Sequence, residues 1–346
     1  MVTKDTVTNI LSHVMDPELG RDLVSLGMIR DIVIEPDVVR FKLVLTIASC
    51  PMRHHMAEDA KNQLLNHPEI NQVDVTFDSM TPEERQAVLK ANKPQLPKLN
   101  AMNRVGQVLS VMSGKGGVGK SSVTAMLAVE LTRQGQKVGI LDADITGPSI
   151  PKLFGLPPGG LRGGPQGLLP AVTPLGIRIV SSNLMLKEED TAIAWRGPMV
   201  AGMIKKFWED VLWGKLDTLL VDLPPGTTDA TLTVMNTLPI RGVMLVSTPQ
   251  QLSSLVVRKA ANLLKRLDIP VLGVIENMSF FRCPDCGGKH DLFGPSHAAE
   301  VAEHSQVNIC ARLPLEPTIA ELCDAGRIED THLEEIEYLA KLLMSA

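Results

Sequence analysis

Short apolar segments alternate with helical segments from residue 105 to the end of the chain. An apolar strand followed by a helix, repeated several times, is typical of a parallel β-sheet covered by helices on both faces. A proline- and glycine-rich stretch, residues 155–174, interrupts the alternation, and we expect it to form an exposed loop. The predicted strands are residues 106–112, 138–141, 177–180, 218–221, 242–246 and 271–275. This part of the chain is therefore predicted to be an α/β unit with a mostly parallel sheet.

The first ninety residues show a different and more compact pattern. It predicts a helix at 7–15, strands at 29–34 and 39–47, a helix through 56–65, and a strand at 73–77. A stretch rich in lysine, proline and asparagine follows and is typical of a linker. We therefore predict a small α/β domain at 1–90, a linker at 91–104 and a second domain at 105–346.

Composition is that of a water-soluble globular protein. Hydrophobic residues make up 44% of the 346 residues and charged residues 21%, and the net charge is −5. An acidic chain without a basic run offers no general surface for nucleic acid. No segment reaches the roughly 20 apolar residues of a membrane helix, and the start lacks the features of a signal peptide. We expect a cytoplasmic protein that binds neither nucleic acid nor membrane.

A glycine-rich loop between a predicted strand and a predicted helix carries the strongest chemical signal. It fits G-x-x-x-x-G-K-[ST], in which glycines let backbone N–H groups surround a phosphate at the start of a helix. The lysine adds charge at the β- and γ-phosphates, the first serine hydroxyl binds Mg²⁺, and the second serine can donate to the α-phosphate. The residues expected to bind ATP are Gly114, Lys115, Gly116, Gly117, Val118, Gly119, Lys120, Ser121 and Ser122.

Acidic residues at strand ends complete the predicted phosphate site. Asp222 ends an apolar strand, where a carboxylate can hold the magnesium shell, and Asp142 and Asp144 follow another strand. These two acids also suit a plain turn-capping role.

The loop sequence GKGGVGKS resembles the deviant Walker A motif of the P-loop ATPase family that includes ParA, MinD, the nitrogenase iron protein and the Mrp/ApbC iron–sulfur carriers. This resemblance implies a homodimer in which Lys115 reaches the partner's phosphates and acts in catalysis with Lys120. It implies that Asp144 orients the attacking water and that Asp142 lies near the magnesium. It also implies that Asn277, which follows a predicted strand, reads the adenine base.

Cys283 and Cys286 form a C-P-x-C-G motif, in which both sulfurs can bind one metal centre. Two further ligands are needed, and His290, Cys310 and Cys323 are the conspicuous candidates within the chain. A symmetric dimer would supply a second pair instead. The spacing of the two cysteines does not distinguish a zinc site from an iron–sulfur cluster site, and it favours a redox-active cysteine pair less than either.

The segments IENMSFFRCPDCG, DADITGPSIP and WRGPM resemble the Mrp/ApbC family. That resemblance implies an ATPase that binds a [4Fe-4S] cluster between two subunits and passes it to apo-proteins, working with a cluster assembly scaffold. The cofactors implied are ATP and Mg²⁺. An alternative is a zinc-stapled ParA/MinD-like ATPase that serves as a nucleotide-switched scaffold or positioning protein, although the acidic C-terminal segment argues against membrane or nucleoid binding.

The N-terminal segment MDPELGRDLVSLGM resembles the small α/β domain of SufT-like assembly factors. Cys50, just before Pro51 and a predicted helix, suits metal or cluster contact through the helix dipole, and equally suits an inert buried thiol. Asp16 is expected to shape a turn, and His54 and His55 to be surface residues.

Overall fold

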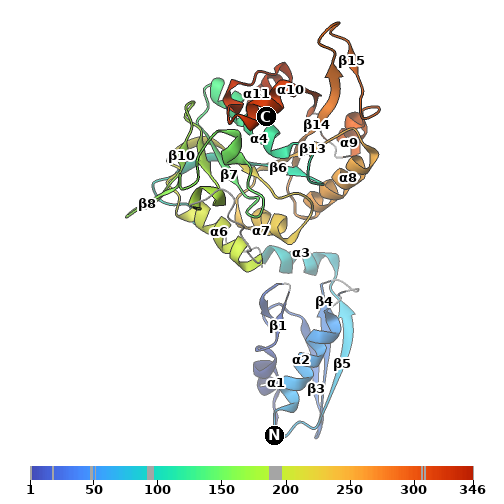
Figure 1. The fold of residues 1–346 in the computed structure, drawn as a ribbon. Helices are drawn as coiled ribbons and strands as arrows, with labels where there is room; N and C mark the ends of the chain where they lie inside the picture. Colours follow the sequence, from blue (N-terminus) through green and yellow to red (C-terminus); the bar gives the residue numbers. More distant parts are fainter. Residues whose placement is uncertain are drawn as a thin grey trace. The chain divides into compact units, whose positions relative to one another are not determined.

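A computed structural model describes residues 2–17, 19–46, 50, 52–91, 97–186, 197–304, 307 and 309–345. The chain divides into two compact units, Met1–Pro94 and Gln95–Ala346, which are called unit 1 and unit 2 below and can be followed by colour in Figure 1. Each unit has its own buried apolar core.

Unit 1 is a three-stranded sheet with helices packed against it. Strand β4 (Val38–Leu45) lies in the centre, antiparallel to β3 (Ile29–Ile34) and parallel to β5 (Gln72–Ser79). Helices α1 (Lys4–Leu11) and α2 (Arg53–Leu65) bury Val7, Leu11 and Leu64 in the core beside Phe41 and Leu43 of β4. A short pair, β1 (Met15–Asp16) with β2 (Arg21–Asp22), completes the connection between α1 and β3.

Two local features of unit 1 differ from the sequence prediction. The first helix ends at Leu11 and not at Met15, because Ser12 Oγ and His13 Nδ1 bond to the Asn9 carbonyl at 2.7 and 2.9 Å. A further helix, α3 (Pro82–Ala91), was not predicted. It begins with a capping box, in which Glu84 N donates to Thr81 Oγ1 at 3.2 Å and Thr81 N donates to Glu84 Oε2 at 3.0 Å.

Unit 2 is built on a mostly parallel sheet, as the sequence predicts. The strand order is β10-β11-β7-β12-β6-β13-β14-β15, and β16 also pairs with β14. The pairs from β11 to β14 and the pair of β14 with β16 are parallel, whereas β10 and β15 run antiparallel to their neighbours. The strand bounds are β6 Arg104–Ser113, β7 Val138–Asp142, β10 Ala171–Val172, β11 Arg178–Val180, β12 Lys215–Asp222, β13 Gly242–Ser247, β14 Val271–Arg282, β15 Lys289–His290 and β16 Ile309–Leu315. All six predicted strands are present, and β10, β15 and β16 are additional strands of this sheet.

Helices cover both faces of this sheet (Figure 1). In β6, Leu109 and Val111 face one apolar cluster and Val108 and Met112 face the other, which explains why apolar residues point to both sides of this strand. The first cluster includes residues of α4 (Lys120–Arg133), α5 (Ile150–Leu153) and α11 (Glu334–Ser345), with α10 (Pro317–Asp324) against it. The second includes residues of α6 (Gly197–Glu209), α7 (Asp229–Thr237), α8 (Gln251–Arg266) and α9 (Ala298–His304).

The segment 155–174 is not a plain loop, so that expectation was wrong. Strands β8 (Arg162–Gly164) and β9 (Gly167–Leu169) pair as an antiparallel hairpin, and β10 joins the edge of the main sheet. These short glycine-rich strands are held by backbone hydrogen bonds. Their sequences therefore show no alternation of apolar and polar residues that would predict a strand.

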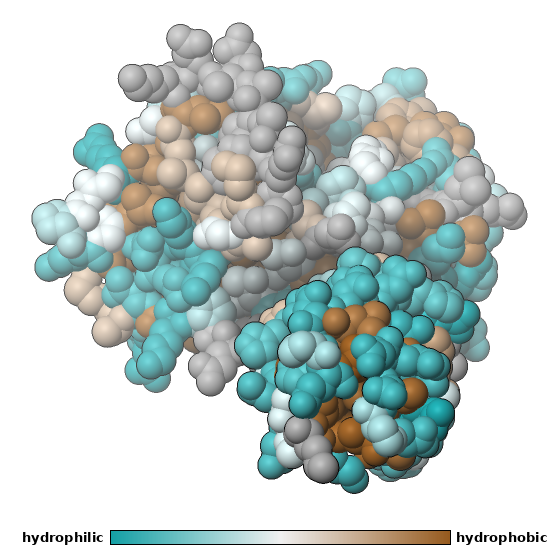
Figure 2. All heavy atoms as spheres, turned by 90° about the horizontal axis from the view of Figure 1, so that it is seen from below, coloured by the Kyte–Doolittle hydropathy of each residue, from teal (hydrophilic) through white to brown (hydrophobic). Residues whose placement is uncertain are grey.

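Figure 2 looks onto the end of unit 1 and shows apolar side chains ringed by hydrophilic ones. The apolar side chains Ile34, Val38 and Ile70 line a cavity of about 700 Å³ in this unit, together with the acidic residues Glu35 and Asp37. Cys50 is not among the lining residues, so this cavity is separate from the thiol. Within the described residues, no helix is both long enough and apolar enough to cross a membrane.

Candidate functional site

The glycine-rich loop follows the carboxyl end of β6, an inner strand of the unit 2 sheet, and connects it directly to α4. Gly117 and Gly119 have φ angles of 77° and 78°, which L-residues with side chains rarely adopt. A Cβ on Gly114 would lie 2.5 Å from Val256 Cγ1, and one on Gly119 would lie 2.3 Å from Asn277 Nδ2. The loop therefore requires glycine at these positions, as a backbone cradle for phosphate does.

Three side chains converge on the buried carboxyl group of Asp222 at the end of β12. Lys120 Nζ lies 2.7 Å and Ser121 Oγ 2.6 Å from Asp222 Oδ2, and Thr124 Oγ1 donates to Asp222 Oδ1 at 2.8 Å. Lysine, hydroxyl and carboxylate form the donor set that suits a magnesium-bound triphosphate. The residues thus fit the nucleotide and metal that the sequence predicts, although their binding roles stay predictions.

Thr124 is a residue that the sequence analysis missed. It lies one helical turn after Lys120 and therefore on the same face of α4. The four-residue spacing from Lys120 is the sequence feature that could have identified Thr124. The Thr124 hydroxyl holds the second carboxylate oxygen of Asp222.

Asp142 lies next to Asp222 on the adjacent parallel strand. Its carboxyl group is fully buried and accepts hydrogen bonds from the backbone N–H groups of Asp144 and Ile150 and from Ser181 Oγ, each at 3.2 Å. Burial and the neighbouring Asp222 raise the pKa of Asp142 to about 8. Burial also raises the pKa of Asp144, whose Oδ1 accepts from Gly147 N at 3.2 Å. The three acids are thus brought together, as the strand ends predict.

This environment of Asp142 predicts a pH-dependent stability. Its pKa is about 8 in the folded chain against an ordinary 3.8, so between these values only the folded chain keeps the proton. Stability must therefore fall as pH rises through this window, by up to about 1.4 kcal/mol per pH unit. We expect the urea-unfolding midpoint of unit 2, without nucleotide or metal, to fall between pH 5.5 and 7.5. The fall should be smaller in Asp142→Asn.

Tryptophan fluorescence reports this transition, since Trp195, Trp208 and Trp213 all belong to unit 2. Equal pH slopes in the two proteins would show that Asp142 is not the group that takes up the proton.

Lys115 is a residue of the phosphate loop, and Asn277 contacts that loop from β14. Lys115 is partly exposed, and its Nζ donates to Gln250 Oε1 at 2.8 Å. Asn277 is buried, and its Nδ2 donates to the Val118 carbonyl of the loop at 2.9 Å. Asn277 thus braces the loop backbone in this structure, and its reading of adenine stays a prediction.

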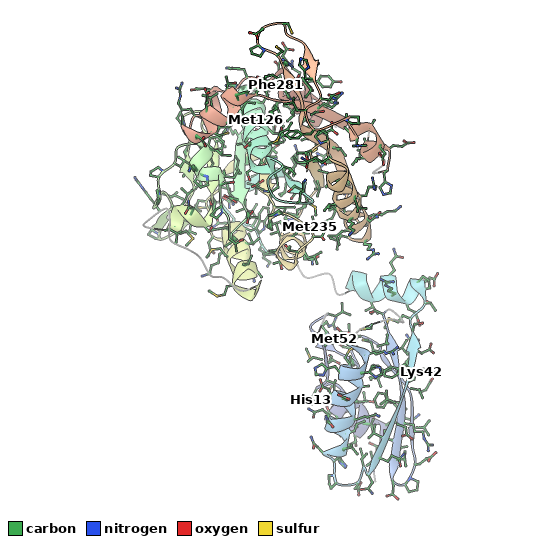
Figure 3. The ribbon with its side chains drawn as sticks, turned by 45° about the vertical axis from the view of Figure 1, so that its right-hand side comes forward. His13, Lys42, Met52, Met126, Met235 and Phe281 are labelled. Carbon is green, nitrogen blue, oxygen red and sulfur yellow. The ribbon has the colours of Figure 1, made fainter. Side chains whose placement is uncertain are left out.

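Cys283 and Cys286 lie in the turn between β14 and β15, at the tip of a hairpin that projects from unit 2 beyond Phe281 (Figure 3). The turn is closed by bonds from Cys283 N to Gly288 O at 2.9 Å and from Gly287 N to Cys283 O at 2.8 Å. Hydrogen bonds from the backbone N–H groups of Cys286 and Asp285, and the Cys286 side chain, lower the pKa of Cys283. The turn therefore favours a thiolate at an accessible position.

Positive charge gathers at the base of this hairpin. Arg282 and Lys289 are cross-strand partners, and their cationic groups lie 5.6 and 4.5 Å from the centroid of the buried Phe280 ring. Arg282 also pairs with Glu335 of α11. These contacts fix the direction in which the hairpin leaves the sheet.

The described residues contain no group of three or more His, Cys, Asp or Glu side chains that could hold a metal ion. His290 lies on β15 near Cys286, since a Cβ on Gly288 would lie 3.3 Å from Cys286 Sγ and 3.5 Å from His290 Nε2. Cys323 lies elsewhere, with its Sγ 4.0 Å from Ser122 Oγ, and burial raises its pKa. Within one chain, the described side chains thus supply a pair of thiols and no complete site.

The remaining residues that the sequence singles out are in unit 1 or fall outside the described residues. Cys50 is buried in the unit 1 core near the start of α2, and no clustered metal-ligating side chains accompany it among the described residues. Pro51, Trp195 and Arg196 lie outside the described residues, as does the side chain of Cys310. Asp16 shapes a turn as predicted, because its Oδ1 accepts from Leu19 N at 2.9 Å.

Two family models match the chain. Residues 104–344 match the family described as NUBPL iron-transfer P-loop NTPase, and residues 4–77 match the family described as iron-sulfur cluster assembly protein.

Iron-sulfur cluster carrier proteins match either nearly the whole chain or about three fifths of it. An iron-sulfur cluster carrier protein of Synechocystis sp. is 38% identical over 330 residues, which are 94% of this chain and 91% of that protein. One from Methanocaldococcus jannaschii is 46% identical over 214 residues, covering 62% of this chain and 74% of its own length.

Solved structures show the same fold for unit 2. A nucleotide-binding protein from Archaeoglobus fulgidus in complex with ADP is 45% identical with a TM-score of 0.62, covering 68% of this chain and 92% of that chain. The cell division ATPase MinD of Pyrococcus furiosus is 20% identical with a TM-score of 0.50, covering 69% and 99% of the two chains, and shares the fold alone.

Proposed function

The chain belongs to the NUBPL iron-transfer P-loop NTPase family of iron-sulfur cluster carriers, and from this premise we propose that it binds and hydrolyses ATP while it carries a [4Fe-4S] cluster to apo-proteins. The observation that supports the proposal is the presence, in one unit, of a phosphate cradle and a projecting pair of thiols. The expected compartment is the cytoplasm, and the expected partners are apo iron–sulfur proteins and a cluster assembly scaffold.

In this proposal the nucleotide is held by the loop residues 114–122 at the start of α4. Lys120 pairs with the β- and γ-phosphates, and Ser121 and Asp222 hold Mg²⁺, which neutralises phosphate charge when bound. Asp142 lies beside Asp222 near the metal, and Asp144 orients the attacking water. Thr124 keeps the Asp222 carboxylate in position throughout.

The cluster is cargo, and each chain offers half of its ligands. Cys283 and Cys286 supply two thiolates, and a [4Fe-4S] cluster needs four. Because the described part of one chain lacks a third ligand, a second copy is the simplest source of the other pair. In that homodimer the partly exposed Lys115 can exchange its bond with Gln250 for the phosphates of the partner's nucleotide.

The proposal is tested by transfer of the cluster to an acceptor. The chain is reconstituted with iron and sulfide without oxygen, separated from free iron, and mixed with an apo-protein whose enzymatic activity needs a [4Fe-4S] cluster. We expect acceptor activity to rise in proportion to the amount of cluster-loaded chain added. The same rise should occur when a chelator that removes free iron is present. If the chelator abolishes activation, the iron passed through solution, and the chain is not a carrier.

A further inference from the structure

Strand β14 connects the two halves of the proposed site. Asn277 contacts the phosphate loop through the Val118 carbonyl at 2.9 Å. Cys283 follows directly after Arg282, the last residue of the same strand. One continuous backbone segment of only a few residues therefore joins the nucleotide cradle to the cluster thiols.

The strand is not regular between these two points. It pairs with β16 at Glu276↔Arg312 and next at Phe280↔Pro314, so residues 277–279 of β14 face a single residue of β16. Met278 in this segment has a φ of 54°, in the left-handed region that a side chain disfavours. The segment 277–279, called the β14 bulge below, is thus a strained stretch that persists only because its surroundings hold it.

Arg312 of β16 holds the β14 bulge from both ends. Its Nε donates to Ser279 Oγ at 2.7 Å and lies 3.6 Å from Glu276 Oε2. Glu276 is only 2% exposed and accepts further bonds from Ser279 Oγ and from His297 N. The guanidinium also lies 5.7 Å from the centroid of the Phe280 ring, which is packed under the hairpin.

We propose that the β14 bulge, clamped by Arg312, couples occupation of the phosphate loop to the position of the Cys283–Cys286 turn. Nucleotide in the loop moves the Val118 carbonyl against Asn277, and a bulge can shift its register in response where a regular strand cannot. Arg312 touches neither nucleotide nor cargo and acts as a positioning residue. The inference rests on the proposed function, to which it adds the path of regulation.

The test measures thiol reactivity of the full chain stripped of metal. Alkylation of Cys283 and Cys286 by iodoacetamide is followed by peptide mass mapping, with and without MgADP, at two chain concentrations. We expect MgADP to change the Cys283 rate by about fivefold or more, equally at both concentrations. In Arg312→Ala the ratio should fall to near one while ADP affinity is kept.

Matched variants keep the test decisive. Arg327→Ala removes an arginine that pairs with the nearby Asp330, and should leave the ratio unchanged. If Arg312→Ala does not fold, Ser279→Ala removes the hydroxyl between Arg312 and Glu276 and should also lower the ratio. Three results would overturn the proposal, namely a wild-type ratio of one, a ratio retained in the folded clamp variants, or an effect seen only at high chain concentration.

An effect seen only at high chain concentration would mean that the coupling arises from association between chains. Because the test uses protein that carries no cluster, failure of the coupling is distinguishable from failure to carry a cluster.

Discussion

Cys283→Ser abolishes cluster binding and leaves ADP affinity unchanged, if the turn between β14 and β15 holds the cargo. The turn is built to stabilise a thiolate, because the N–H groups of Asp285 and Cys286 lower the pKa of Cys283. A serine hydroxyl stays protonated in the same place and is a poor ligand for iron. The two sites use different side chains, so the nucleotide half should stay intact. Visible absorption after anaerobic reconstitution and ADP titration measure the two properties separately.

Cys323→Ser is the matched control. This thiol is half-buried on α10, and burial raises its pKa, so it is a poor thiolate donor. We expect the cluster absorption of this variant to equal that of the wild type. A cluster that survives in Cys283→Ser, or disappears in Cys323→Ser, would assign the ligands to other residues.

Lys120→Ala should lower ATP hydrolysis by about a hundredfold or more, the usual cost of removing one cationic contact from a phosphoryl-transfer site. Lys120 is only 7% exposed, and its ammonium group contacts the fully buried Asp222. The substitution therefore also leaves a buried carboxylate without its cation, which should lower stability. Steady-state phosphate release, with the unfolding midpoint measured in parallel, separates the two effects.

Lys259→Ala on the exposed side of α8 provides a comparison that changes charge alone. Its turnover should match that of the wild type. Full hydrolysis by a folded Lys120→Ala protein would remove Lys120 from the proposed mechanism.

The regular part of the fold could be predicted from the sequence, and the comparisons confirmed both the fold class and the family. The six central strands each contain a run of apolar residues, because both faces of the sheet are covered. Helix α3 was also predictable, since Thr81 and Glu84 have capping-box spacing. It was missed because its residues show little apolar periodicity.

Other features of the fold correspond to no recognisable pattern in the sequence. Met278 has a left-handed backbone, and its neighbours Glu276 and Ser279 are held by Arg312, a residue 34 positions later than Met278. The extension of β14 as far as Arg282 depends on pairing with β15 and β16, and neither of these strands was predicted. Such long-range contacts override local sequence preference.

The candidate site likewise has a part that the sequence predicts and a part that it does not. A loop motif between a strand and a helix identifies Lys120 and Ser121, and a strand end identifies Asp222, because local geometry places these residues. The contact between Asn277 and Val118 joins segments far apart in the chain and could not be predicted from either segment. The ligand roles, the bound cofactors and the homodimer stay predictions.

The most direct test of the central claim is the iron, sulfide and zinc content per chain of protein reconstituted without oxygen, with the mass of the loaded species measured in the same sample. One four-iron cluster shared by two chains predicts about two irons and two sulfides per chain, little zinc and a dimer. About half a zinc per chain without visible absorption, or a full cluster on a monomer, would contradict a shared iron–sulfur cargo at Cys283 and Cys286.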